Sequence, residues 1–241
     1  MNNISFYNNK ICLNVLAGSV ENAKQIVDAA QGHVVVGLLS ANYPTVEEAV
    51  EDIKIYQAAI DNKVSVGLGA GNPKQWKAVA QISAKVNPQH VNQIFTAVGY
   101  TRALCDEAYI NALVSPCGKV GFLNISTGYL SREKETAIVP AATAIAMVKE
   151  FGGNSLKYFP MKGTELMDEF TEICKICAKE EIDLELTGGV DASNLKILLK
   201  TALENGVSRV IPHIYSAIVD KQTGLTKIED VKKLFDIIKS V

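Results

Sequence analysis

One lysine sits inside an apolar run where a charge is hard to explain by structure alone. Lys157 lies in the stretch SLKYFPM, residues 155–161, which otherwise reads as a buried strand. Lysine is seldom buried unless it is paired or used chemically. At an ordinary pKa of about 10.4, only a few parts in ten thousand of the amine are neutral at pH 7, and a drop of about 3 units takes roughly 4 kcal/mol. Apolar neighbours can supply such a shift, and a neutral amine can attack a ketone to form a Schiff base. A structural ion pair is the alternative.

A carboxylate that could work with this amine stands in the next apolar run. Glu185 lies in DLELTGG, residues 183–189. Because side chains alternate along a strand, Glu185 and Thr187 share one face, as Ser155 and Lys157 do on theirs. If both faces point inward, the amine and the carboxylate lie side by side. Schiff-base chemistry needs an acid–base group, whereas a buried ion pair adds little stability, so we favour a catalytic Lys157–Glu185 pair.

Two glycines follow this strand and open a segment with a helical pattern. Gly188 and Gly189 let the backbone approach an anion, and the start of the next helix points N–H groups at it. In barrels, the loops after strands seven and eight often bind phosphate. We therefore take Thr187, Gly188, Gly189 and Ser216 as candidate phosphate-binding residues, with a tight strand-to-helix turn as the alternative reading.

These residues are carried by alternating apolar runs and amphipathic segments. The predicted strands are residues 10–18, 33–40, 63–71, 90–98, 120–127, 155–161, 183–189 and 209–215. The predicted helices are residues 19–32, 45–62, 72–87, 101–110, 139–153, 164–181, 191–206 and 227–240. The strands are short and not cleanly alternating, which is typical of parallel strands buried on both faces. Units of about 30 residues favour a (β/α)8 TIM barrel, with an open doubly wound sheet as the runner-up.

The segment before the fifth predicted strand is irregular. Pro116 to Gly118 form a turn signal between two extended runs, so we expect a hairpin-like insertion there. No linker or low-complexity tract is visible, and we expect residues 1–241 to form a single barrel domain. The polar residues at strand ends then become candidate substrate-binding residues: Asn72, Gln93, Arg102 and Thr127.

Histidines and cysteines carry weaker signals. His33 and His90 stand at predicted strand starts, the stability face, and we expect both to be structural, while His213 lies late on the last strand and could touch substrate. Cys174 and Cys177 lie three apart within a predicted helix, which places them on one helix face and favours a structural role. No His, Asp or Glu cluster has metal-ligand spacing, so we expect neither a metal nor a cofactor.

Composition excludes several classes of protein. The chain has 241 residues, 48% of them hydrophobic and 21% charged, with a net charge of −2. A charge so near zero gives no global field for nucleic acid or an acidic membrane. The N-terminus lacks a secretory pattern, and no apolar run approaches the roughly 20 residues of a membrane span. We expect a cytoplasmic protein with a small-molecule partner, and a homo-oligomer is compatible with barrels of this kind.

The motifs also resemble a known enzyme family. LKYFPM resembles the lysine-containing Phe-Pro segment of the pyruvate-dependent aldolases that cleave 2-keto-3-deoxy-6-phosphogluconate or 4-hydroxy-2-oxoglutarate, and LTGGVDASN resembles their phosphate loop. GAGNP resembles a strand end of the same family, with Asn72 where a substrate-contacting threonine is usual. HVNQIFT and VIPHIYSAIVDK are similar to the narrower branch tied to glucosaminate-type sugar acid breakdown, the KDGP aldolases.

The resemblance implies a class I, metal-independent aldolase. Lys157 would form the Schiff base, and the reaction would split 2-dehydro-3-deoxy-6-phosphogluconate into pyruvate and glyceraldehyde 3-phosphate. The alternatives are cleavage of 4-hydroxy-2-oxoglutarate into pyruvate and glyoxylate, or a non-catalytic phosphosugar-binding barrel. A divalent-metal aldolase is disfavoured because no ligand set is visible in the sequence.

Strand two departs from the wider family. That family carries a catalytic glutamate and a nearby arginine there, whereas HVVVGLLSAN has neither. We therefore take Glu185 as the replacement acid–base group and Arg102 as a candidate clamp for the substrate carboxylate, because a guanidinium can bind a carboxylate through two parallel hydrogen bonds. The family's Gly-Gly-Ser phosphate strand is PHIYSA here, with Ser216 as the remaining hydroxyl.

Overall fold

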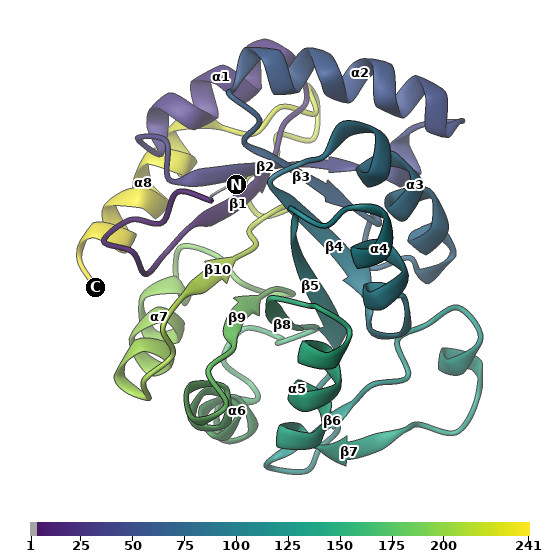
Figure 1. Cartoon of the computed structure of the whole chain (residues 1–241). Helices are drawn as coiled ribbons and strands as arrows, with labels where there is room; N and C mark the ends of the chain where they lie inside the picture. The colour runs from purple at the N-terminus through teal and green to yellow at the C-terminus, as the bar shows by residue number, and fades with distance from the viewer. Residues whose placement is uncertain (1–3) are drawn as a thin grey trace.

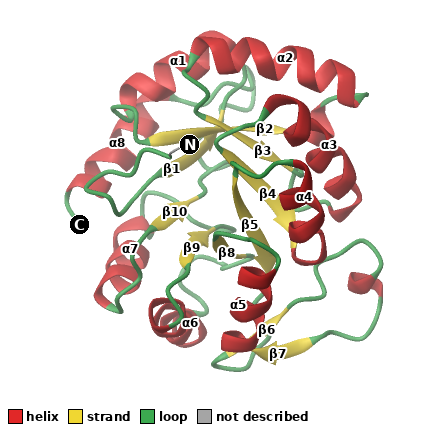
Figure 2. Cartoon of the chain, in the orientation of Figure 1, coloured by secondary structure: helices red, strands yellow, loops and turns green. Residues whose placement is uncertain are grey.

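Eight parallel strands form a closed ring at the centre of the molecule. The computed structural model describes residues 4–241. The strands follow one another around the sheet in the order β1-β2-β3-β4-β5-β8-β9-β10. Their bounds are β1 Leu13–Leu16, β2 Val34–Leu39, β3 Val64–Gly67, β4 His90–Ile94, β5 Tyr109–Val114, β8 Ser155–Tyr158, β9 Asp183–Leu186 and β10 Val210–Pro212. Figure 1 and Figure 2 show these strands inside and the helices around them.

Closure comes from contacts between the first and the last strand. Parallel bridges join Ile11 to Val210 and Asn14 to His213. The backbone N–H of Ile214 donates to the carbonyl of Asn14 at 3.0 Å. A doubly wound sheet would keep two free edges, so this ring confirms the predicted (β/α)8 barrel over the open alternative.

Helices connect the strands and cover the outside of the barrel. Their bounds are α1 Val20–Ala29, α2 Val46–Ala59, α3 Trp76–Val86, α4 Val98–Leu104, α5 Ala141–Glu150, α6 Met167–Lys179, α7 Leu195–Glu204 and α8 Ile228–Lys239. Local sequence explains several of their starts. The side chains of Ser19 and Thr45 accept hydrogen bonds from the N–H groups of Asn22 and Glu48, which satisfies donors that a helix start leaves free.

The fifth barrel strand differs from the prediction. It is β5, whereas the predicted strand at residues 120–127 contains only the short β6, Phe122–Asn124, which pairs antiparallel with β7, Ile138–Pro140, in a separate sheet. The expected insertion around Pro116 to Gly118 thus follows the fifth strand instead of preceding it. Both runs are short and apolar, and periodicity alone cannot tell which of them joins the barrel.

The outer layer fits the structural reading of the paired cysteines. Cys174 and Cys177 are fully buried on α6, and burial raises the pKa of Cys174 to about 12.

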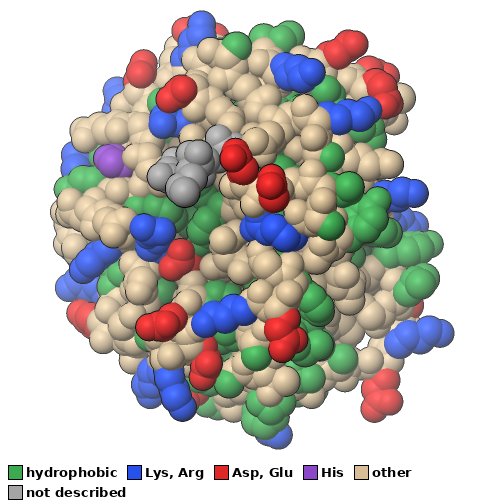
Figure 3. Space-filling model, in the orientation of Figure 1, with side chains coloured by type: hydrophobic (Ala, Val, Ile, Leu, Met, Phe, Trp, Pro, Cys, Tyr) green, Lys and Arg blue, Asp and Glu red, His purple; other side chains and the backbone are tan. Residues whose placement is uncertain are grey.

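Among the residues described, no helix is long and apolar enough to cross a membrane. On the face drawn in Figure 3, acidic and basic side chains are interspersed, consistent with a net charge of −2.

Candidate active site

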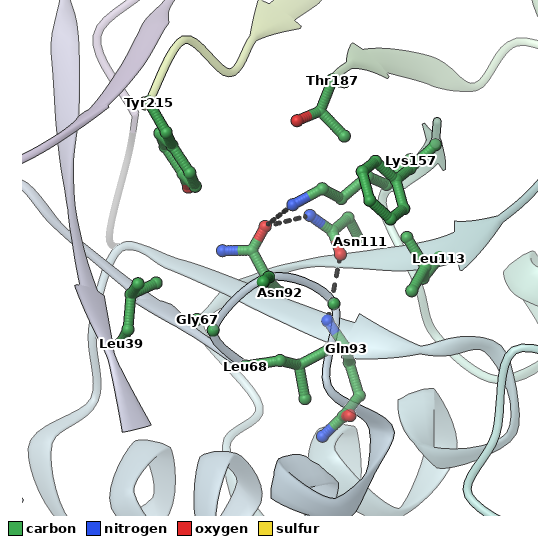
Figure 4. A pocket seen from close by; sticks show the side chains of 14 residues that line it. Leu39, Gly67, Leu68, Asn92, Gln93, Asn111, Leu113, Lys157, Thr187 and Tyr215 are labelled. Atoms are coloured by element: carbon green, nitrogen blue, oxygen red, sulfur yellow. Dashed lines mark hydrogen bonds between the residues drawn. The ribbon is translucent and has the colours of Figure 1, made fainter. Parts of the chain in front are cut away.

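A cavity opens at the carboxyl ends of the barrel strands, where (β/α)8 enzymes place their active sites. Seven of the eight barrel strands, or the loops that follow them, contribute residues to its lining, and Figure 4 shows these residues. The lining includes Leu39, Gly67–Gly71, Asn92, Gln93, Asn111, Leu113, Lys157, Phe159, Thr187 and Tyr215. Of the predicted site residues, Lys157, Thr187 and Gln93 are therefore at this cavity.

Lys157 carries the only amine among these lining residues. Its Nζ donates to Asn92 Oδ1 at 2.6 Å (Figure 4). The same Nζ lies 3.3 Å from His213 Nδ1. Burial lowers the pKa of Lys157 to about 8, even though the charge of Glu185 acts in the opposite direction. An amine with that pKa is about one-tenth neutral at pH 7, against a few parts in ten thousand for an ordinary lysine. The amine is thus suited to nucleophilic attack on a carbonyl.

Glu185 lies beneath the cavity and is completely buried. Its two oxygens accept four hydrogen bonds. Oε1 accepts from His90 Nε2 at 3.0 Å and Ser155 Oγ at 2.5 Å, and Oε2 accepts from His213 Nε2 at 2.6 Å and Asn111 Nδ2 at 2.7 Å. Burial acts to raise the pKa of Glu185, but the contributions of His90 and His213 outweigh it and hold that pKa well below its ordinary value. The carboxylate is therefore ionised and has every lone pair occupied.

The expected Lys157–Glu185 pair is only partly right. The two residues are register partners on β8 and β9, so both point into the barrel as predicted. No direct ion pair joins them in the described part of the chain; the link runs through His213, which contacts both groups, or through Asn92 and Asn111. Glu185 has no exposed surface, so from this position its carboxylate does not reach the cavity directly.

His90 and His213 meet at Glu185, a grouping that the sequence analysis did not predict. His90, which we expected to be structural, is fully buried, and its ring bonds to Glu185 and, through Nδ1 at 2.7 Å, to the Ser65 hydroxyl. With Glu185, the two histidines form a group whose ligand atoms lie within 4.8 Å of one another, a geometry that could hold a metal ion and that spacing in the sequence did not reveal. However, both histidines already donate to a carboxylate that also accepts from Ser155 and Asn111, so the group fits a hydrogen-bonded network better than a metal site.

This network continues across the barrel interior. Asn92 Nδ2 donates to Ser65 Oγ at 2.9 Å, and Asn14 Nδ2 donates to the same oxygen at 3.1 Å. Asn111 Nδ2 donates to Asn92 Oδ1 at 2.9 Å. Sequence reasoning missed these residues as a group. The signal was present on β4, where His90 and Asn92 occupy alternate positions and so face the same side.

The side chains of Gln93 and Thr127, both predicted to bind substrate, have hydrogen-bond partners within the scaffold. The Gln93 side chain points away from Lys157 in Figure 4. Its Nε2 donates to Trp76 O and Thr101 Oγ1, and its Oε1 accepts from Ile94 N. Thr127 Oγ1 donates to Leu113 O at 2.8 Å and accepts from Phe95 N at 3.1 Å. Their hydrogen-bonding groups are thus engaged, and on β4 the inward position is one residue earlier, at Asn92.

Arg102 and Asn72 also have local partners. Arg102 Nε donates to Gly152 O at 2.8 Å and its NH2 to Asn154 Oδ1 at 2.8 Å, just before β8 begins. That end of the strand is opposite the cavity, so the proposed carboxylate clamp does not fit this position. Asn72 lies next to the cavity loop Gly69–Gly71, and its Oδ1 accepts from Lys74 N at 3.1 Å.

The glycine loop after β9 packs closely against the loop after β8. Gly188 and Gly189 have φ angles of +86° and +83°, which glycine adopts readily. A Cβ at Gly189 would come within 2.6 Å of the backbone nitrogen of Gly163. Within residues 4–241, neither glycine N–H donates a backbone hydrogen bond, and Ser216 is exposed after β10. Close packing thus requires the glycines, while their N–H groups stay available to a ligand.

Fold and site together define a class of protein. The chain is a (β/α)8 barrel that holds a lysine of lowered pKa in a cavity at the carboxyl ends of its strands, above a buried acid–base network. Two solved structures share the fold. The tryptophan synthase α-subunit of Pyrococcus furiosus is 11% identical over 98% of this chain and 100% of that one, with a TM-score of 0.62. N-(5'-phosphoribosyl)anthranilate isomerase of the same organism is 12% identical over 96% and 100%, with a TM-score of 0.58. At such identities, they show the fold alone.

Sequence comparisons show the family. The family model for KDGP aldolase matches residues 7–222. A curated relative from Salmonella typhimurium, named 2-dehydro-3-deoxy-phosphogluconate aldolase, is 42% identical over 247 residues and covers 100% of both chains. The chain therefore belongs to the KDGP aldolase family, which makes it an aldolase, a carbon–carbon lyase, and confirms the resemblance read from its motifs.

Proposed function

We propose that the chain is a class I aldolase that cleaves 2-dehydro-3-deoxy-6-phosphogluconate into pyruvate and glyceraldehyde 3-phosphate through a Schiff base on Lys157. The observation that carries this proposal is the Lys157 amine, which faces the cavity with a pKa lowered to about 8. The curated relative's name supports the substrate.

The proposed reaction follows from the amine. Neutral Lys157 attacks the C2 ketone, and the carbinolamine takes up one proton from solvent and loses water to leave an iminium; hydrolysis later carries that proton away on the lysine ammonium. The iminium accepts the electron pair of the C3–C4 bond as that bond breaks, which releases the aldehyde and leaves an enamine of pyruvate. Protonation at C3 restores the iminium, and water then releases pyruvate and the lysine ammonium.

The phosphate of this substrate would bind at the loop after β9. Thr187 lines the cavity, and the N–H groups of Gly188 and Gly189 can meet a phosphate oxygen. Ser216 is exposed in the loop after β10 and can supply a hydroxyl. If this half-site is real, kcat/KM for the phosphorylated substrate should exceed that for 4-hydroxy-2-oxoglutarate by 100-fold or more. Equal values would move the phosphate site elsewhere.

Reduction of the Schiff base tests the central step. Incubation with pyruvate and borohydride should attach a reduced pyruvate adduct to Lys157, located by peptide mass spectrometry. Lys157→Arg, which retains the charge but cannot form the adduct, is the matched control and should be inactive. An unmodified Lys157 in the wild-type chain would refute the mechanism, as would activity that disappears with a chelator and returns with a divalent ion.

We extend the proposal to a cytoplasmic homo-oligomer. Exposed apolar side chains on and near the β6–β7 insertion, Val120, Leu130 and Ile138, support association because exposed apolar clusters often mark interfaces. Light scattering after gel filtration gives the mass directly, and a monomer at micromolar concentration would reject this part of the proposal.

A further inference from the structure

A tyrosine stands at the edge of the cavity in contact with the buried network. Tyr215 follows β10 and lines the cavity, across from Lys157 in Figure 4. Its hydroxyl donates to Asn14 Oδ1 at 3.1 Å and lies 3.1 Å from His213 Nδ1. The phenol is thus the point at which the Glu185–His213 pair reaches the cavity.

Strand β2 leaves room for this hydroxyl. A Cβ at Gly37 would lie 3.3 Å from Tyr215 Oη and 3.4 Å from Asn14 Oδ1. β2 reads Val-Val-Val-Gly-Leu-Leu and offers no ionisable side chain at this level of the barrel. A larger residue at Gly37 would first meet Leu16 Cδ2, at 2.9 Å, and then the tyrosine hydroxyl and its partner, so glycine at this position leaves space for all three.

His213 has one lone pair to share between two donors. Because the Glu185 carboxylate only accepts, His213 Nε2 must carry the proton of their 2.6 Å bond, which leaves Nδ1 as the acceptor. Both Lys157 Nζ, at 3.3 Å, and Tyr215 Oη, at 3.1 Å, lie next to that nitrogen. While the lysine is an amine, it can donate there and the phenol donates to Asn14. An iminium has only one N–H, so Schiff-base formation can free Nδ1 for the phenol.

We propose that Tyr215 is the acid–base group that moves the proton from the C4 hydroxyl to C3, with His213 as its relay and Glu185 holding His213 in place. This proposal rests on the function proposed above. Tyr215 and His213 contact the reacting groups, and Glu185 is a positioning residue.

Each proton in this cycle has a donor and an acceptor within the site. As C3–C4 breaks, the C4 hydroxyl gives its proton to Tyr215 Oη, and the phenol's own proton passes to His213 Nδ1. The C4 oxygen becomes the aldehyde carbonyl, and the C3–C4 electron pair moves into the enamine. Tyr215 then protonates C3, and His213 returns its proton to the phenol. No proton, electron or co-reactant beyond the substrate is needed in these steps.

Charge changes on Lys157 suit this relay. In the resting site, two effects lower the pKa of His213 to about 3: burial, which is the larger, and the positive charge of Lys157. Cleavage turns the cationic iminium into a neutral enamine at the moment when His213 must accept a proton. The positive charge thus moves from the lysine nitrogen to the imidazole, where the Glu185 carboxylate stabilises it.

Tyr215→Phe tests the assignment, because it keeps the ring and removes only the hydroxyl. We expect kcat to fall by 100-fold or more, with KM changed less than threefold. Exchange of the pyruvate methyl protons with deuterium oxide should fall in parallel, since it requires proton transfer at C3. The borohydride adduct on Lys157 should still form at long incubation times. Tyr43→Phe is the matched control: it removes a hydroxyl that donates to Asp52 on α2 at 2.6 Å, outside the barrel, and should keep cleavage and exchange.

The outcomes separate this proposal from the one on which it rests. A wild-type chain without a Lys157 adduct refutes the Schiff-base mechanism, whatever Tyr215 does. If the adduct forms on both proteins but Tyr215→Phe keeps methyl exchange and cleavage within threefold of wild type, the mechanism stands and the Tyr215 relay is refuted.

A second variant protects the test against simple damage to the site. His213→Gln should also lower kcat. The kcat of the double variant His213→Gln/Tyr215→Phe should be no lower than that of the less active single variant, because the effects of groups that act as one unit are not additive. Multiplied losses, or an adduct absent from Tyr215→Phe while its melting temperature matches wild type, would overturn the relay.

Discussion

Glu185→Gln should make Lys157 a better nucleophile and the protein a worse aldolase. The carboxylate raises the pKa of Lys157 against the larger effect of burial. Removing that charge therefore lowers the pKa of the amine below about 8. The same change removes the anion that stabilises a protonated His213, so cleavage should slow.

The geometry sets the size of the effect. Through His213, the path from Lys157 Nζ to Glu185 consists of hydrogen bonds of 3.3 Å and 2.6 Å and one imidazole ring, so the charges lie at most about 8 Å apart. At an effective dielectric constant of about 20, this gives about 2 kcal/mol, or about 1.5 pKa units. The pKa of Lys157 would fall to about 6.5, and its neutral fraction at pH 7 would rise from about one-tenth to about three-quarters.

Competitive labelling with a trace of acetic anhydride measures this pKa directly. The extent of acetylation at Lys157 is followed from about pH 5 to pH 10 by mass spectrometry, and its midpoint reports the amine. Glu169→Gln is the matched control. Glu169 is also buried, on α6, and accepts from the N–H groups of Cys117 and Gly118 at 3.1 Å, so its loss should reduce stability without moving the midpoint.

The expected result is a midpoint about 1.5 units lower with kcat reduced at least tenfold. A midpoint that stays or rises would show that Glu185 does not act on the amine electrostatically. Unchanged turnover with a lowered midpoint would show that Glu185 does not assist proton transfer through His213, although its charge acts on the pKa of Lys157.

Three further outcomes test the structure. Lys157→Met should abolish activity yet raise the free energy of unfolding at pH 7 by about 3 kcal/mol, because the lowered pKa of the lysine penalises folding below about pH 8. Denaturant titrations should show this gain vanish as pH rises towards 10.5, where the unfolded lysine also loses its proton. Gly189→Ala should lower the free energy of unfolding by about 3 kcal/mol, since φ is +83° and the new Cβ would lie 2.6 Å from Gly163 N. Gly118→Ala, with φ at +77° but open space around the Cβ, should lower it by about 1 kcal/mol. Equal losses in the two variants would contradict the loop packing. Of the 5 cysteines, Cys117 alone is not buried, so a thiol reagent should modify Cys117 first in the folded protein. Faster reaction at Cys174 than at Cys117 would contradict the packing of α6.

Much of the fold could be predicted because its signals are local. Short apolar strands and amphipathic helices each bury their own faces, and their alternation implies a parallel sheet with helical connections. The assignment failed at β5, where two apolar runs flank one turn and only long-range pairing with β4 and β8 decides which belongs to the barrel. Choosing Gln93 over Asn92 failed for a related reason: alternation separates two faces of a strand without saying which one is inward.

By itself, the sequence determined the alternation of strands and helices, the lysine within its apolar strand and the glycine pair that follows the next strand. Only the tertiary structure decided which groups meet that lysine. His90 and Glu185 are 95 positions apart in sequence, and Tyr215 and Asn14 are 201 apart, yet each pair is in hydrogen-bond contact inside the ring. Such contacts depend on strand register and on closure between β1 and β10, which no local pattern encodes.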